Sequence, residues 1–377
     1  MGKHRKRQRR PRHHPRRISR RIALVSAGLL IPLTGGAVVF AATDDPGRPA
    51  ARSPRTRDGA RPRAAVDAGS RPAPGTTSSP SAPLPRTPAP SASPSAASGP
   101  RIAFAPYADV LAWPPLTLPK GVKNYTMGSV SAGGGCSAAW GGLSPVDAAF
   151  AVKRIKDVPG KVIVSFGGPH GVELAQSCDS VDDLVKQYRK AVDATDPAGL
   201  DFYLTESDLS DTEAVRRRTS ALVRLQHDHA LPFSITLPLH RSGLSPAGID
   251  ALRSADSAGL QVSLVNLVPA DGGGQSVTGS ATAAHGQLQR LYRQSDAQVW
   301  QRMGLTPIIG VAGVGAQFRP PDAQELVSWA TAHGLGRLSM WSVTRDTPCT
   351  ADTSVTSDTC SGLDEDGGVF TKIFRGF

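Results

Sequence analysis

Eight short apolar runs punctuate residues 101–377 of this chain, and helical patterns separate most of them. The runs are Ile102–Tyr107, Asn124–Val130, Lys161–Gly167, Leu200–Glu206, Pro232–Leu237, Gln261–Val268, Pro307–Val311 and Arg337–Val343. Short strands that are apolar throughout and alternate with helices are typical of a parallel sheet covered by helices. Eight of them in about 277 residues fit a TIM (β/α)8 barrel better than an open doubly wound sheet.

The helical patterns between the runs begin with capping residues. Ser144 and Pro145 open the first and Ser180 opens the second. The others cover Ser210–Asp228, Ser245–Ser254, Ala281–Gln301 and Pro321–His333. Only the proline-rich stretch between the first two runs has no such pattern. Since the active site of a TIM barrel lies at the carboxyl ends of its strands, the last residues of each run are the candidates for function.

A different organisation precedes the barrel. Residues 22–42 carry no charge and are long enough for a transmembrane helix, and the eleven bases of residues 1–21 predict a cytoplasmic tail. A cleaved signal peptide is the alternative, and it would make the protein secreted. Residues 43–100 contain no Phe, Tyr or Trp and are predicted to be a disordered linker. Both interpretations put the barrel, residues 101–377, outside the cytoplasm.

The distribution of charge argues against nucleic-acid binding. The net charge of +12 comes from the N-terminal part, because residues 101–377 hold 24 bases and 27 acids. A nucleic-acid-binding domain would carry its bases on the folded part. No glycine-rich phosphate-binding motif follows the first run either, which disfavours a dinucleotide cofactor.

The four cysteines all lie in the part predicted to be exported. In an oxidising compartment we expect the disulfides Cys136–Cys178 and Cys349–Cys360, with four reduced thiols as the alternative. The first would join loops that are neighbours in a barrel, and the second would close a short loop after the last strand. No Cys or His spacing resembles a zinc site, so we expect neither a metal nor a cofactor.

Six segments, in order along the chain, resemble family 18 of the glycoside hydrolases, the chitinases. They are APYADVLAWPP, KVIVSFGGPHG, AGLDFYLTE, VSLVNLVPADGGG, TPIIGVAGV and LSMWSVTRDTPC. The second holds the SxGG motif of the family's third strand, here Ser165, Gly167 and Gly168, which we interpret as structural. The third stands where the family has its D-G-x-D-x-D-x-E signature.

The resemblance implies a chemistry whose groups are largely missing here. In the family a glutamic acid protonates the leaving oxygen, and an aspartate orients the N-acetyl group of the substrate, which is the nucleophile. On this chain the first aspartate of the signature becomes Ala198, the third becomes Tyr203, and the glutamic acid becomes Thr205. Asp201 alone keeps its carboxyl group. A threonine hydroxyl does not ionise at working pH and cannot replace the acid.

Other candidates follow from the same alignment. Glu206 comes one residue too late and would face the helices in a regular strand, so it could act as the acid only through a bulge or at a strand end. Trp341 occupies the position of the family's sugar platform. Asn266 and Asp271, on the sixth strand and just after it, and Tyr203 are the remaining candidates for contact with a substrate.

Two functions of different class remain open. The first is a binding module that holds chitin or another N-acetylglucosamine-containing glycan without cutting it. The second is an active, diverged endo-glycosidase that uses Glu206, for which the register of the strand must shift. A third alternative is a structural extracytoplasmic domain with no affinity for sugar.

Overall fold

The computed structural model describes residues 102–377 except 113–115, 143–144, 271–276, 314–315 and 351–356. The predicted tail, membrane span and linker therefore lie outside the described residues, as does Asp271. Among the residues that are described, no helix is both long enough and apolar enough to cross a membrane.

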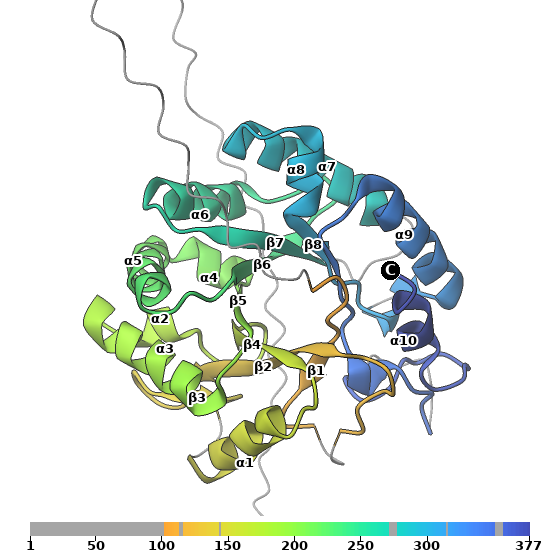
Figure 1. Ribbon diagram of the computed structural model, residues 1–377, viewed down its shortest axis with the longest axis horizontal. Helices are drawn as coiled ribbons and strands as arrows, with labels where there is room; N and C mark the ends of the chain where they lie inside the picture. Colours follow the sequence, from red (N-terminus) through yellow and green to blue (C-terminus); the bar gives the residue numbers. More distant parts are fainter. Residues whose placement is uncertain (1–101, 113–115, 143–144, 271–276, 314–315, 351–356) are drawn as a thin grey trace, which may run out of the picture. The chain divides into compact units, whose positions relative to one another are not determined.

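Eight parallel strands form the centre of the fold, in the order β1-β2-β4-β5-β6-β7-β8-β11 (Figure 1). Their bounds are Tyr107–Asp109, Asn124–Ala132, Lys161–Gly167, Gly199–Tyr203, Phe233–Leu239, Val262–Pro269, Met303–Leu305 and Arg337–Leu338. The last strand also bonds to the chain just before the first: Leu338 N–H donates to the Ala103 carbonyl (2.8 Å), and Tyr107 N–H donates to the Met340 carbonyl (3.0 Å). The sheet thus curls back on itself, and its eight parallel strands are consistent with the predicted TIM barrel.

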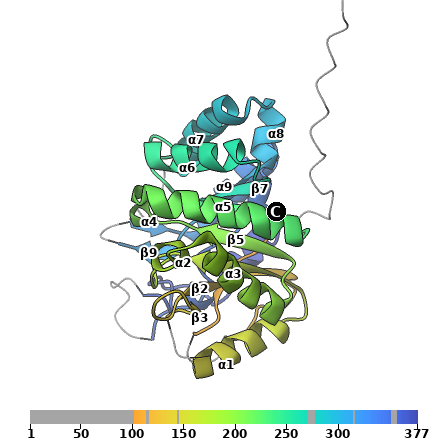
Figure 2. The same ribbon diagram turned by 90° about the vertical axis from the view of Figure 1, so that its left-hand side faces the viewer.

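Helices cover the outside of this sheet, and Figure 2 shows α3, α5, α6 and α7 following one another on one side. The helices are α1 (Pro145–Lys156), α2 (Leu174–Ser177), α3 (Val181–Thr195), α4 (Glu206–Ser210), α5 (Thr212–Asp228), α6 (Pro246–Ser257), α7 (Val277–Tyr292), α8 (Asp296–Gln301), α9 (Pro320–His333) and α10 (Val369–Phe374). The predicted caps Ser180 and Ser245 are present, and each hydroxyl accepts a hydrogen bond from the third backbone N–H that follows (3.1 Å in both).

Two expectations about element bounds are corrected here. The seventh barrel strand is Met303–Leu305 and not Pro307–Val311, because Pro307 offers no N–H to the ladder. After Pro307, β9 (Gly310–Ala312) pairs antiparallel with β10 (Ala316–Phe318) outside the barrel. The helix expected over Ala281–Gln301 is two helices, α7 and α8, because the chain turns at Arg293, whose φ is 52°.

One strand lies outside the predicted pattern. β3 (Ala138–Trp140) returns antiparallel along the end of β2 and extends the sheet beside the barrel. The connecting turn contains Cys136, and its disulfide to Cys178 fixes this hairpin to the chain that follows α2, with the two Cα atoms 4.5 Å apart. The second disulfide joins Cys349 and Cys360, whose Cα atoms are 5.1 Å apart. Both predicted pairs are confirmed.

The direction of the side chains on β5 decides what reaches the interior of the barrel. Phe202 points outward, where it stacks on Phe166 of β4 (ring centroids 5.2 Å apart) and meets Tyr188 of α3 (5.5 Å). Successive residues of a strand point to opposite faces, so Asp201 and Tyr203 point inward. The signature strand therefore directs one carboxyl group and one phenol ring into the barrel.

Candidate functional site

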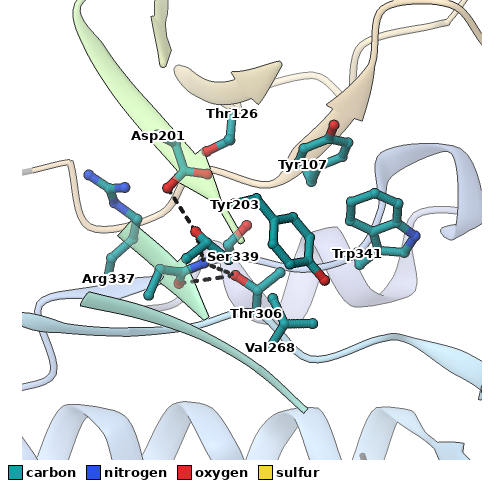
Figure 3. A pocket seen from close by; sticks show the side chains of 11 residues that line it. Tyr107, Thr126, Asp201, Tyr203, Val268, Thr306, Arg337, Ser339 and Trp341 are labelled. Atoms are coloured by element: carbon teal, nitrogen blue, oxygen red, sulfur yellow. Dashed lines mark hydrogen bonds between the residues drawn. The ribbon is translucent and has the colours of Figure 1, made fainter. Parts of the chain in front are cut away.

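A small pocket lies inside the barrel and is lined by residues from six of its eight strands and from the chain that follows β8 and β11 (Figure 3). The lining residues are Tyr107, Thr126, Asp201, Tyr203, Thr236, Asn266, Val268, Thr306, Arg337, Ser339 and Trp341. Its free space is about 20 Å³, which is room for about one water molecule. The barrel interior is thus nearly filled by side chains at the depth where Asp201 lies.

Asp201 is held by three hydroxyl groups. Its carboxylate accepts hydrogen bonds from Ser165 (3.0 Å), Ser234 (2.7 Å) and Thr236 (2.7 Å). The strand register explains this, because Ser165, Asp201 and Ser234 lie side by side on β4, β5 and β6. Burial raises the pKa of Asp201, while the hydroxyl donors and the positive charge of Arg337 oppose that rise. Both oxygens are engaged, so Asp201 joins three strands.

Asn266 belongs to a second buried network. Its amide nitrogen donates to Thr236 (3.1 Å) and to Thr306 (2.8 Å), and its amide oxygen lies 3.1 Å from the Thr306 hydroxyl. Asn266 is 8% exposed. It lines the floor of the pocket, and the hydrogen bonds to neighbouring strands occupy both ends of its amide group.

Aromatic rings close the outer end of the pocket. Tyr107 stacks on Trp341, with ring centroids 4.2 Å apart. Tyr203 meets Trp341 edge to face at 6.4 Å, and Figure 3 shows its ring between Asp201 and Trp341. Burial raises the pKa of Tyr203 to about 12, so the phenol is neutral at physiological pH. The ring thus occupies the approach to Trp341 from within the barrel.

The SxGG motif makes room for Tyr203. Gly167 has φ 77°, and a Cβ atom there would lie 2.5 Å from the Tyr203 carbonyl oxygen. A Cβ atom on Gly168 would lie 3.2 Å from the Tyr203 ring, and Gly168 N–H donates to the Tyr203 carbonyl (2.8 Å). These glycines therefore allow β4 and the tyrosine of β5 to approach closely, in keeping with the structural interpretation of the motif.

Thr205, at the position of the family's acid, begins a helix. Its hydroxyl donates to the carboxylate of Asp208 (2.7 Å) and accepts from the Asp208 N–H (3.3 Å). Thr205 N–H also donates to the same carboxylate (2.8 Å), which completes a capping box for α4. The side chain at this position is committed to the helix N-terminus.

Glu206 is the first residue of α4 and lies on the exposed rim. One carboxylate oxygen is 2.6 Å from His240 Nε2, and the other accepts from the Ser245 hydroxyl (3.1 Å). Glu206 does not line the pocket that holds Asp201, Tyr203 and Trp341. The structure thus brings those three residues and Asn266 together and leaves Glu206 apart from them.

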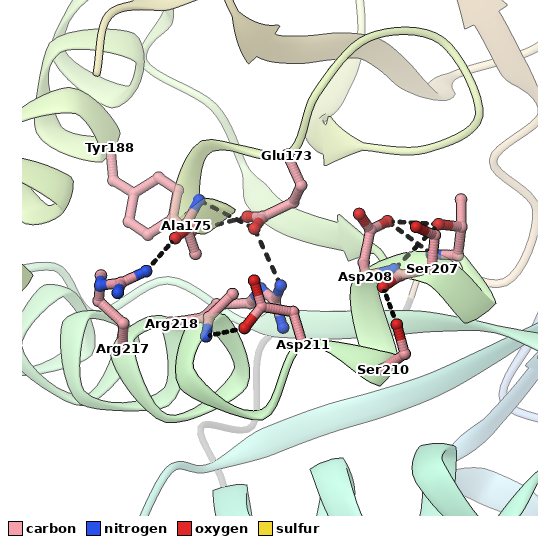
Figure 4. Close-up of polar contacts among 11 residues, drawn as sticks. Glu173, Ala175, Tyr188, Ser207, Asp208, Ser210, Asp211, Arg217 and Arg218 are labelled. Atoms are coloured by element: carbon pink, nitrogen blue, oxygen red, sulfur yellow. Dashed lines mark hydrogen bonds and ion pairs between the residues drawn. The ribbon is translucent and has the colours of Figure 1, made fainter. Parts of the chain in front are cut away.

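A buried ion pair holds the loop after β4 (Figure 4). Glu173 accepts from Arg218 of α5 (2.9 Å), from the Ala175 N–H (2.8 Å) and from the Tyr188 hydroxyl (3.3 Å). The Glu173 and Arg218 side chains are 3% and 4% exposed. Because this loop carries His170 towards Trp341 (ring centroids 6.2 Å apart), the ion pair helps to fix one edge of the mouth.

Sequence reasoning missed several residues of the site. Tyr107 ends the first predicted run, so the rule that strand ends carry the site could have identified it. Thr306 follows a strand that the sequence does not predict, Met303–Leu305. Arg337 begins the last strand, whereas the rule for TIM barrels selects only the residues at the end of each run. His170 lies in a loop, and no pattern in the sequence indicates that it meets Trp341.

No family model matches the chain, but individual proteins do. Over 238 residues it is 32% identical to the "Probable bifunctional chitinase/lysozyme" of Escherichia coli strain K12, covering 56% of this chain and 26% of that protein. Over 219 residues it is 32% identical to Endochitinase 11 of Metarhizium anisopliae, covering 52% of this chain and 42% of that protein. The chain thus spans about a quarter and about two-fifths of the lengths of these curated relatives.

Solved structures extend the similarity to the whole barrel. Active domain 2 of a thermostable chitinase from Pyrococcus furiosus, studied as catalytic-site mutants complexed with chito-oligosaccharides, matches with a TM-score of 0.65 at 28% identity. The match covers 74% of this chain and 94% of that domain. The catalytic domain of a chitinase from the same organism matches with a TM-score of 0.63 at 29% identity, over 74% and 95% of the two chains.

The barrel, the SxGG motif on β4 and the aspartate beside it on β5 define a glycoside-hydrolase type of barrel. In sequence and in structure the chain is similar to chitinases, which are members of family 18 of the glycoside hydrolases.

Proposed function

We propose that this barrel is a chitinase-like domain that binds an N-acetylglucosamine-containing glycan and hydrolyses it weakly or not at all. The observation that carries the proposal is the capping box of Thr205. A general acid must reach the glycosidic oxygen with a proton to give. The Thr205 hydroxyl is far too weak an acid to give one, and it donates its hydrogen bond to the Asp208 carboxylate (2.7 Å).

The other carboxyl groups near the signature support the loss of hydrolysis. Asp201 accepts three hydrogen bonds and is 4% exposed, so it is unsuited to deliver a proton to a ligand at the mouth. Tyr203 carries a neutral ring where the family orients its acetamido nucleophile with a carboxylate. Loss of a general acid alone typically lowers the rate by about 10²–10⁴-fold.

The binding function rests on Trp341 and on the relatives. Trp341 is partly exposed between the two hollows at the mouth, and Tyr203 lies beside it. Aromatic faces pack on the apolar C–H surface of pyranose rings. The similar Pyrococcus furiosus domain was crystallised with chito-oligosaccharides. We therefore propose Trp341 and Tyr203 as glycan contacts, with Asn266 below them and Asp271 as a further contact at the end of β7.

Two alternatives remain as proposals. An active, diverged chitinase would use Glu206 as its acid, and the Glu206 carboxylate lies 2.6 Å from His240 Nε2. A purely structural domain would explain why the pocket at Asp201 has room for only about one water molecule. The disulfides favour an extracytoplasmic location. We propose that residues 22–42 anchor the protein in the cell membrane as a single span, or are cleaved to release it.

Hydrolysis of fluorogenic chito-oligosaccharides by the purified chain separates these functions. We expect no rate above background for the protein or for Glu206→Gln, and weaker glycan binding for Trp341→Ala. Hydrolysis that is lost in Glu206→Gln would establish the diverged enzyme. If the protein neither hydrolyses nor binds the glycan, the interpretation as a purely structural domain is the one that agrees with the result.

A further inference from the structure

A second hollow lies beside the pocket and shares Tyr107 and Trp341 with it. We call it the side hollow; Asp109, His170 and Asp358 also line it. Its free space is about 130 Å³, against about 20 Å³ in the pocket at Asp201. An engineered cavity of about 150 Å³ in another protein takes up one benzene ring. The side hollow therefore has room for about one six-membered ring, whereas the pocket beneath Tyr203 does not.

The charges that face the side hollow are negative. Asp109 ends β1, and Asp358 lies in the loop well after β11, so two segments far apart in the chain contribute one carboxylate each. Burial, and to a smaller degree the charge of Asp358, raise the pKa of Asp109. Among the described residues that line the hollow, none is a Lys or Arg, and His170 is the one other titratable nitrogen group.

Two arginines lie behind these carboxylates but are bound to the backbone. Arg154 donates to the carbonyls of Val110 (2.7 Å) and Ala112 (2.9 Å). Arg345 donates to the carbonyl of Ile309 (2.8 Å) and is 1% exposed. They moderate the negative charge without lining the hollow, so a ligand there meets the carboxylates and not the guanidinium groups.

Asp109 is poised to receive a cation. One of its oxygens accepts from the Leu111 N–H (2.8 Å), which fixes the carboxylate at the end of β1. Burial raises the pKa of Asp109, while the Leu111 N–H and the charges of His170 and Arg154 oppose that rise in part. A ligand with a positive charge would compensate the charge of this carboxylate further, and a neutral ligand would not.

We propose that the side hollow binds an amino-sugar residue with a free, protonated amine. Its ammonium group would lie between Asp109 and Asp358, and the apolar face of its ring would pack on Trp341 and Tyr107. An N-acetylated residue is neutral and cannot form the charged contact. The inference rests on the proposed glycan binding and deepens it: the preferred glycan contains residues from which the acetyl group has been removed.

The test compares two tetrasaccharides, one of glucosamine and one of N-acetylglucosamine, by calorimetric titration into the purified full chain at pH 6, where a primary amine is protonated. We expect the glucosamine tetramer to bind at least about tenfold more tightly. Asp109→Asn keeps the oxygen that accepts from Leu111 and removes the charge. It should lower that affinity about tenfold, which is about 1.4 kcal/mol, and leave the acetylated tetramer unaffected. Asp358→Asn is expected to act in the same way.

Asp193→Asn is the matched control, since Asp193 is an exposed carboxylate on α3 outside the hollow. Tetralysine is the control ligand, because it has the charge without the sugar ring. Equal affinity for the two tetrasaccharides would overturn the proposed amino-sugar site and leave the proposed glycan binding in place. An equal loss of affinity for the glucosamine tetramer in Asp109→Asn and Asp193→Asn would do the same. Tetralysine binding as tightly as glucosamine would also overturn the amino-sugar site. If neither sugar binds, the proposed glycan function fails as well.

Discussion

Changing Tyr203 to Asp and Thr205 to Glu together should give this barrel chitinase activity. The double variant returns the two carboxyl groups that the family signature has at these positions. The single change Thr205→Glu should not suffice, because the neutral phenol of Tyr203 cannot orient the N-acetyl group of a substrate as a carboxylate does. The single change Tyr203→Asp should not suffice either, because no proton donor would be present.

The structure also indicates how much the two changes should lower the free energy of unfolding. Thr205 caps α4, and loss of an N-cap costs about 1 kcal/mol. Tyr203 is half-buried, so its removal should cost less than the 3–5 kcal/mol of a fully buried aromatic ring, about 2 kcal/mol. The sum, about 3 kcal/mol, predicts a fall in Tm of about 10 °C. The assay should therefore run well below the melting temperature of the variant.

The measurement is the release of a fluorophore from chito-oligosaccharides, with Tyr203→Asp/Thr205→Gln as the matched control. Gln copies the shape of Glu without its proton, so the two double variants should differ by about 10²–10⁴-fold in rate. A folded variant that hydrolyses no faster than its Gln control would refute the reasoning. So would a parent chain that already hydrolyses at the rate of the double variant.

Three further predictions concern stability. Glu173→Gln leaves the buried charge of Arg218 unpaired and should cost about 3–5 kcal/mol in urea unfolding, whereas Glu173→Gln/Arg218→Met should recover much of it; equal losses would contradict this. Burial raises the pKa of Asp109, so the folded protein holds that proton more tightly and its free energy of unfolding should fall as pH rises from about 4 through the raised pKa. Asp109→Asn should flatten that part of the pH profile, and an unchanged profile would exclude the effect. Cys349→Ser should cost about 3 kcal/mol, since its partner Cys360 closes an 11-residue separation, and the cost should vanish when the parent protein is reduced.

Much of the fold could be predicted because its strands are short, apolar and bounded by capping residues. The seventh strand could not, since Met303–Leu305 has three residues and the longer apolar run after Pro307 resembles a strand better. Gly304 shows why so short a segment fits there: a Cβ atom would lie 2.8 Å from the Asn266 side-chain oxygen. That closeness depends on tertiary packing, and no local pattern reveals it.

In the candidate site, too, some features could be predicted from local sequence and others depend on contacts between distant segments. The sequence predicts Asp201 and Tyr203 on one strand, and both lie on β5, because the register of one element is local information. The predicted strand Leu200–Glu206 is too long, since β5 ends at Tyr203 and Thr205 caps α4. The sequence Thr205-Glu-Ser-Asp208 is also a readable capping box, and it could have predicted that α4 begins at this point. The contacts among Tyr107, His170 and Trp341 join segments far apart in the chain, so they become visible only when the barrel closes.

The two substitutions in the signature support each other physically. With Thr at 205, the chain leaves β5 and enters α4 at once, and Glu206 turns to His240 on the rim (2.6 Å). The space that a catalytic pair would have needed is then free for the ring of Tyr203, which Gly167 and Gly168 admit. A bulge that brought Glu206 inward would have to break the capping box and displace that ring. The side chains of the signature therefore oppose the rescue of hydrolysis by Glu206, and they leave the space beside Trp341, towards Asp109 and Asp358, as the open part of the mouth.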